Sequence, residues 1–156
     1  MISKTSLAWG TLVIALAPAV GWAADAPAAV DGQAIFKQIC AACHQPGGEG
    51  LPGLAPPLAG TLAPLLAHDD GRRYMAQVLV HGLSGRIESK GQEFNLAMPP
   101  QSALSDAELA AAAGYVAREL NQSEGRGPSA DEVAAARGAA LSHKQLREWR
   151  ARLLKP

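Results

Sequence analysis

The chain has 156 residues, with 14 basic and 14 acidic side chains and a formal net charge of zero. This balance argues against nucleic-acid binding, which requires an excess of positive charge. Aromatic side chains make up only 4 % of the sequence, and two of the three tryptophans lie before residue 24. The length suffices for one small domain with an extension, but its core is short of aromatic bulk.

The first 23 residues have the pattern of a secretory signal peptide. Lys4 supplies a positive charge, residues 7–17 are mostly apolar, and Gly21-Trp22-Ala23 offers small residues at the cleavage positions. The apolar run is shorter than the roughly 20 residues that span a membrane, so we expect cleavage rather than a retained anchor. No twin-arginine pair precedes the run, which predicts Sec-type export to the periplasm. A linker over residues 24–30 follows.

A first helix is predicted from Gly32 to about Ala42. Asp31 can cap its amino terminus, and apolar residues recur along it at helical spacing. The helix runs into the pentapeptide Cys40-Ala41-Ala42-Cys43-His44, which contains both cysteines of the chain. The spacing C-x-x-C-H is typical of covalent haem attachment.

Helix geometry explains why this spacing suits haem. The thiols of Cys40 and Cys43 can flank one edge of a porphyrin, and His44 can reach the iron as the proximal ligand. A thioredoxin-like pair would need a βαβ context, half of a zinc site would need further ligands nearby, and a structural disulfide would leave His44 unexplained. We therefore expect one covalently attached haem c per chain. The macrocycle would also supply apolar bulk that the core lacks.

The segments that follow alternate between loops and helices. Residues 45–66 are rich in Gly and Pro and are expected to form a loop around the macrocycle edge. A second helix is predicted to begin with Asp69 or Asp70 as its cap and to stop at Gly82.

A second Gly-rich stretch leads to Met98-Pro99-Pro100, with no regular element predicted on the way. The segment Ser105-Asp106-Ala107-Glu108 then has the pattern of a capping box. Apolar residues recur at helical spacing behind it, which predicts a third helix as far as Leu120.

In this order and at these separations, the motifs resemble those of class I c-type cytochromes. The pieces that carry the resemblance are Cys40-Ala41-Ala42-Cys43-His44, Pro56-Pro57-Leu58-Ala59-Gly60, His81-Gly82-Leu83-Ser84-Gly85, Met98-Pro99-Pro100 and Leu104-Ser105-Asp106-Ala107-Glu108-Leu109. The resemblance covers residues 31–121. It implies a small all-α cytochrome c fold around one covalent haem.

The resemblance implies that Met98 is the sixth iron ligand, opposite His44. The ligand chemistry agrees, because a soft thioether opposite imidazole favours ferrous iron and raises the reduction potential. Met75 and His81 are weaker candidates. An ordinary core position accounts for Met75, and a cation at a helix end accounts for His81.

The resemblance also implies a backbone partner for His44. A proline carbonyl would accept the Nδ1 proton of His44 and so orient the ring. The sequence allows Pro56 or Pro57 in this role, and the match of the residues that follow favours Pro56.

With both iron positions filled, the expected function is one-electron transfer rather than catalysis. The expected partners are a periplasmic dehydrogenase as donor, of which the chain could be the electron-accepting subunit, and an oxidase or another cytochrome as acceptor. The alternative is a haem enzyme subunit or a gas-binding sensor in which Met98 dissociates to open the iron.

The last part of the chain exceeds what this fold needs. A linker over residues 122–128 leads to an extension over residues 129–156, with a capping box at Ser129 and a further helix from Ser142 to about Leu154. Residues 137–156 contain six basic side chains and one acid, for a net charge of +5, whereas residues 24–136 carry −6.

This charge asymmetry allows three interpretations of the extension. It could fold back on its own acidic domain, dock to a redox partner, or touch anionic lipid as a basic amphipathic helix. Trp149 distinguishes the first two, since it would be buried against the domain in one and exposed in the other.

Overall fold

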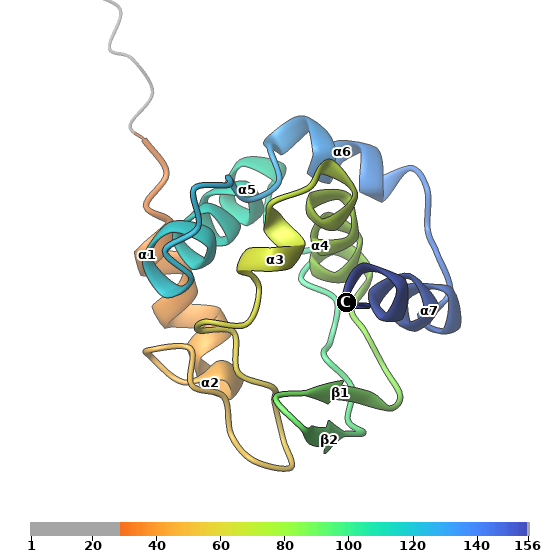
Figure 1. Ribbon diagram of the computed structural model, residues 1–156. Coiled ribbons are helices and arrows are strands. Elements are labelled where there is room, and N and C mark those ends of the chain that lie inside the picture. Colours follow the sequence, from red (N-terminus) through yellow and green to blue (C-terminus); the bar gives the residue numbers. More distant parts are fainter. Residues whose placement is uncertain (1–28, 156) are drawn as a thin grey trace, which may run out of the picture.

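The structure, a computed structural model, describes residues 29–155, and the predicted signal peptide lies outside this range. The described chain is mainly helical, as expected for a small all-α fold (Figure 1). None of its helices is long and apolar enough to cross a membrane. The elements are α1 (Gly32–Ile35), η1 (Phe36–Cys40), α2 (Ala41–His44), α3 (Ala63–Leu66), α4 (Asp69–His81), β1 (Ile87–Ser89), β2 (Gln92–Phe94), α5 (Asp106–Tyr115), η2 (Val116–Leu120), α6 (Ala130–Arg137) and α7 (His143–Leu153).

The segments α1, η1 and α2 together form the predicted first helix. Asp31 caps it, with Oδ1 accepting hydrogen bonds of 3.0 Å from the backbone N–H groups of Gln33 and Ala34. The middle segment, η1, is a π-helical turn, and the helix continues to His44 before Gln45 ends it with a φ of +65°. The C-x-x-C-H motif therefore occupies the end of this helix.

The first helix crosses α5 at very short range. A Cβ atom on Gly32 would lie 2.0 Å from the carbonyl oxygen of Ala111, so only glycine permits this approach. The rings of Phe36 and Tyr115 pack beside the crossing with centroids 5.3 Å apart. The predicted capping box opens α5, because Ser105 and Glu108 exchange side-chain and backbone hydrogen bonds.

The second predicted helix is α4, and its end is where the sequence places it, at Gly82 with a φ of +74°. The prediction that Asp69 or Asp70 caps this helix is wrong. The N-cap is His68, whose side chain makes no capping bond, and both aspartates lie in the first turn, where they interact favourably with the helix dipole. The loop predicted over residues 45–66 ends in one helical turn, α3.

The second Gly-rich stretch contains a hairpin that the sequence did not indicate. Strands β1 and β2 pair antiparallel, with Ile87 opposite Phe94. Lys90 and Gly91 connect them, both with positive φ, as in a type I′ turn. The hairpin places Ile87 and Phe94 toward the centre of the domain, where both line the cavity described below.

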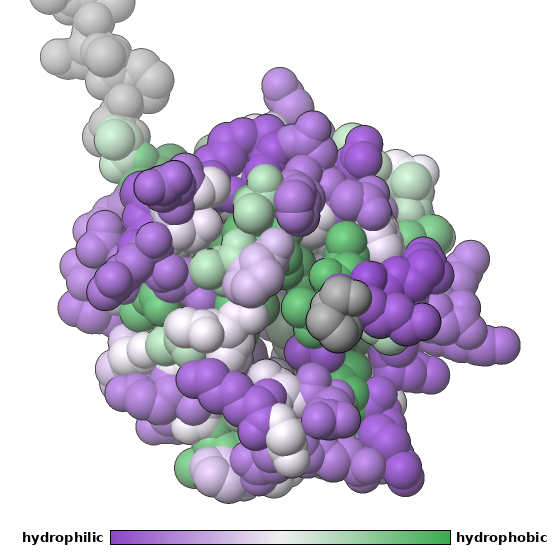
Figure 2. Space-filling view, in the orientation of Figure 1, coloured by the Kyte–Doolittle hydropathy of each residue, from purple (hydrophilic) through white to green (hydrophobic). Residues whose placement is uncertain are grey.

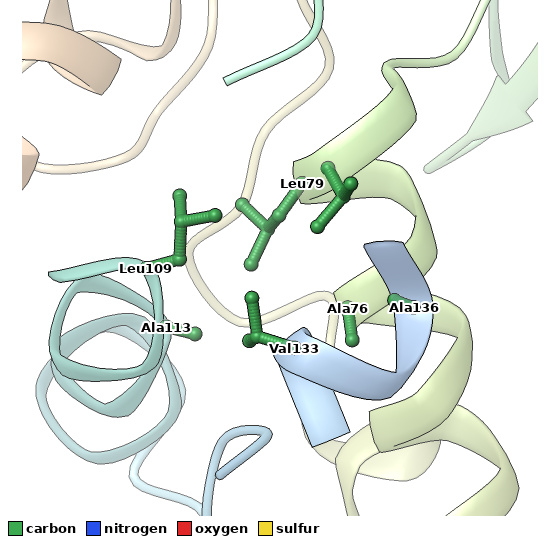
Figure 3. Packing of buried hydrophobic residues seen from close by; sticks show 7 residues of the cluster. Ala76, Leu79, Leu109, Ala113, Val133 and Ala136 are labelled. Atoms are coloured by element: carbon green, nitrogen blue, oxygen red, sulfur yellow. The ribbon is translucent and has the colours of Figure 1, made fainter. Parts of the chain in front are cut away.

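The extension folds back on the domain. Helix α6, opened by a capping box at Ser129, inserts Val133 and Ala136 between α4 and α5 (Figure 3). The buried cluster consists of Ala76, Leu79, Val80, Leu109, Ala113, Val133 and Ala136. At the end of α6, Arg137 donates a 2.6 Å hydrogen bond to Asp106, which ties the extension to the start of α5.

Helix α7 packs against α4 through its apolar face. Leu146 is fully buried, and Trp149 lies half-buried with its ring 5.8 Å from that of Tyr74, edge to face. The indole Nε1 donates a 3.0 Å hydrogen bond to Asp70. Trp149 thus takes the position expected if the extension folds back on its own domain.

Candidate haem site

A cavity of about 390 Å³ lies at the centre of the domain. Figure 2 shows a hollow near the middle of the face in view, bordered by both apolar and polar residues. The cavity brings together side chains from nearly every element, and its wall is mostly apolar. The predicted site residues Cys40, Cys43, His44, Pro56 and Met98 all line it.

The two cysteines reach the cavity from the end of the first helix. Cys40 is partly buried and Cys43 is exposed, and the two are not joined in a disulfide. Three residues apart on a helix, they face the same side. Burial raises the pKa of the Cys40 thiol, so this group is protonated at neutral pH. Both cysteines are thus unpaired and line the same cavity.

The imidazole of His44 is oriented by a backbone carbonyl. Only 7 % of His44 is exposed, and its Nδ1 lies 2.9 Å from the carbonyl oxygen of Pro56. Because a carbonyl can only accept, the proton of the neutral ring is on Nδ1, and the lone pair is on Nε2. Burial lowers the pKa of His44, although the hydrogen bond to Pro56 acts in the opposite direction. A buried, neutral imidazole with a free Nε2 can ligate a metal ion.

The loop after His44 is folded so that Pro56 is this partner. The N–H of Gly50 donates a 2.9 Å bond to the carbonyl of His44, and a Cβ on Gly50 would lie 2.6 Å from the carbonyl oxygen of Ala55. Gly50 has a φ of +73°, so glycine meets both requirements there. The carbonyl of Pro57 instead accepts a 2.9 Å bond from the hydroxyl of Thr61.

Met98 is held by its backbone beside the end of α4. It exchanges two hydrogen bonds with Leu83, of 2.8 and 3.0 Å. Gly82 makes this pairing possible, since a Cβ there would lie 2.4 Å from the carbonyl oxygen of Met98. The N–H of Gln101 then donates a 2.9 Å bond to the carbonyl of Leu79. The thioether is partly buried and contacts the apolar core.

The two rival ligands differ in position. Met75 also lines the cavity, where it packs against all three apolar clusters of the domain. His81 does not line it, and its Nε2 lies 2.8 Å from the carbonyl oxygen of Ala136 on α6. Within residues 29–155, no group of three or more His, Cys, Asp and Glu side chains could hold a metal ion by itself.

Sequence reasoning missed one part of the site. The hairpin contributes Ser89 and Phe94 to the cavity wall, and α7 and the residue after it contribute Arg150 and Leu154. No local pattern signals these residues, because each reaches the cavity through a tertiary contact.

The cavity fits the cofactor that the motif predicts. Its mostly apolar wall suits a flat hydrophobic macrocycle, and the side chains that line it include two thiols, an imidazole and thioethers. These donors are the ones that c-type cytochromes use for haem.

Comparison with known proteins gives the same result. The family described as "Cytochrome C oxidase, cbb3-type, subunit III" matches residues 27–116. A cytochrome c-552 from Thermus thermophilus is 40% identical over 130 residues, which cover 81% of this chain and 87% of the relative. A second cytochrome c-552 from the same species is 40% identical over 127 residues, which cover 79% of this chain and 96% of that relative.

The match extends past the C-x-x-C-H motif over most of the chain. It therefore establishes the cofactor as covalently bound haem c and the general role as electron transfer. This chain belongs to the family of monohaem c-type cytochromes.

Proposed function

We propose that this cytochrome is a one-electron carrier whose haem is attached through Cys40 and Cys43 and whose iron is ligated by His44 and Met98. The observation that carries the proposal is the convergence of these four side chains on one cavity, with the imidazole already oriented by Pro56. Haem bound there supplies a reversible ferric/ferrous couple.

The surroundings of the two proposed ligands favour a carrier over an enzyme or a sensor. The Pro56 carbonyl holds the imidazole in one orientation and makes it a stronger ligand. The backbone of Met98 is held by two hydrogen bonds with Leu83, which fix the point from which its thioether projects. The apolar wall limits the access of water to the iron.

We further propose that the protein works in the periplasm, between a dehydrogenase and a respiratory acceptor. The signal-peptide pattern of residues 1–23 supports export. The family description refers to an oxidase subunit, which supports an oxidase on the acceptor side.

Absorption spectroscopy of the purified holoprotein tests the iron ligation. A His/Met centre shows a methionine-to-iron charge-transfer band in the oxidised form, and its reduced spectrum does not change under carbon monoxide. A missing band, or rapid carbon monoxide binding at neutral pH, would instead support the enzyme or sensor with a dissociable Met98.

A further inference from the structure

Haem brings two negative charges into this cavity. Its two propionates lie at the edge of the macrocycle opposite the vinyl groups that react with cysteine. Attachment at Cys40 and Cys43 therefore directs the propionates away from α2. A carboxylate in a largely apolar environment is destabilised unless a cation or hydrogen-bond donors face it.

The described residues place one arginine or lysine on the cavity wall, and it is Arg150 of α7. Figure 1 shows α2 and α7 on opposite sides of the central space, with the carboxyl-terminal end of the chain on the α7 side. Leu154, one turn further along the chain, lines the cavity as well. The positive charge thus lies on the side of the cavity away from the attachment thiols.

Helix α7 is held firmly enough to fix the position of this charge. Leu146 is fully buried, and Trp149 contacts Tyr74 and donates to Asp70. Arg147 donates a 2.5 Å bond to the carbonyl of Ser84. Helix α7 is therefore anchored to the domain over the turn that precedes Arg150.

The guanidinium of Arg150 has unused donors. One terminal nitrogen donates a 2.8 Å bond to the carbonyl of Glu88 on β1. No carboxylate among residues 29–155 forms an ion pair with Arg150. Arginine has five N–H donors, and its planar fork matches a carboxylate. A partly buried guanidinium without an anionic partner is a binding site for one.

Tyr74 adds a neutral hydrogen-bond donor to the cavity wall. The side chain lines the cavity, and burial raises the pKa of Tyr74 to about 12 despite the opposing effect of the Arg150 charge. The hydroxyl therefore keeps its proton at every physiological pH. Tyr74 and Arg150 both line the cavity.

We propose that Arg150 is the counter-ion of a haem propionate and thereby makes the carboxyl-terminal extension part of the haem site. This inference rests on the proposed attachment of haem at Cys40 and Cys43. A cation paired with the propionate reduces the negative charge near the iron and so favours the ferrous state. The extension would then raise the reduction potential as well as cover the domain.

The test compares Arg150→Gln with Arg147→Gln in the holoprotein. Both variants remove one arginine of α7 that donates to a backbone carbonyl, but Arg147 does not line the cavity. We expect Arg150→Gln to lower the midpoint potential clearly more than Arg147→Gln does. The difference should persist at high ionic strength, because a direct, partly buried pair is screened less than a surface charge.

Resonance Raman spectroscopy of the propionate bending modes reports the contact itself. We expect a shift of one mode in Arg150→Gln and none in Arg147→Gln. Equal potentials and unshifted modes in the two variants would overturn the role of Arg150. If Arg150→Gln does not accumulate as holoprotein, Arg150→Lys replaces it, since lysine keeps the charge but loses the fork. A propionate bending mode that is shifted in Arg150→Lys relative to the wild-type protein then supports the contact with Arg150, and an unshifted mode contradicts it.

The spectrum of the wild-type protein separates this proposal from the one before it. Covalent haem with a His/Met spectrum supports the proposed function whatever the arginine variants do. A wild-type protein without this spectrum would refute the proposed function. Equal midpoint potentials and propionate modes in the two variants of a normal His/Met cytochrome would refute only the inference about Arg150.

Discussion

The replacement Leu146→Ala should strongly destabilise the protein, although it lies in the extension and not in the predicted cytochrome domain. Leu146 is fully buried in the cluster that joins α7 to α4, together with Leu65, Leu66 and Tyr74. Truncation of a buried leucine leaves a cavity and costs about 2–5 kcal/mol of unfolding free energy. The extension therefore contributes to the stability of the whole domain.

Denaturation by guanidinium chloride measures this effect. With a slope of about 3 kcal/mol per M, a loss of about 3 kcal/mol moves the midpoint down by about 1 M. Two signals should be followed, haem absorption for the domain and tryptophan fluorescence for the extension. Trp149 is the only tryptophan after residue 23, so in a protein produced without residues 1–23 its emission reports α7 alone. We expect haem to quench this emission while the helix is docked.

Lys144→Ala is the matched control. Lys144 is on the same helix, its side chain is 78 % exposed, and it makes only a 3.9 Å ion pair with Glu148. An exposed pair of this kind contributes about 0.3–0.5 kcal/mol, so the control midpoint should move little. Equal midpoints for the two variants would refute the claim that α7 is part of the cooperative fold. An early fluorescence change with an unshifted haem transition would show that α7 detaches alone.

Three further predictions concern the haem and the charge network. Met98→Ala should lower the reduction potential in voltammetry while haem stays attached, and an unchanged potential would mean that another group is the sixth ligand. The double replacement Cys40→Ala with Cys43→Ala should make all haem extractable by acid acetone, and haem that remains bound would contradict attachment at these thiols. The hydrogen bond with Arg126 is the main cause that lowers the pKa of Glu132 to about 2. The stabilisation from ionised Glu132 is therefore present above about pH 4.5 and is lost as the pH falls toward 2. In Glu132→Gln, the free energy of unfolding should fall less steeply as the pH is lowered from about 4.5 toward 2. An unchanged pH dependence in this range would exclude the contribution of Glu132.

Local signals predicted the helices of this protein well. The capping boxes at Ser105 and Ser129 open α5 and α6, and Gly82 ends α4, because each signal acts within one turn of the chain. The same kind of local signal gives the wrong N-cap for α4. Two adjacent aspartates favour a cap, but here they occupy the first turn, and the extended residue before them is His68.

Long-range contacts determined what the sequence could not predict. The hairpin has strands of three residues and a Lys90-Gly91 turn in place of the usual Asn-Gly, so its pairing depends on burying Phe94 in the domain. The resemblance already favours Pro56 over Pro57, but the physical reason lies in the fold of the loop around Gly50. The position of Arg150 depends on the docking of α7, which no local pattern specifies.

The structure also changes the interpretation of the basic extension. Its charge suggests docking to a partner, yet Arg137 pairs with Asp106, and Arg147 and Arg150 donate to carbonyls of the domain. These three arginines therefore contact the domain itself, which supports the interpretation that the extension folds back on it. Deleting the extension would remove the fully buried Leu146, so slower electron exchange by a truncated protein would not by itself demonstrate docking. A replacement on the exposed face of α7, such as Lys144→Ala, changes the surface charge and leaves the core intact, and it is the variant that can reveal a partner.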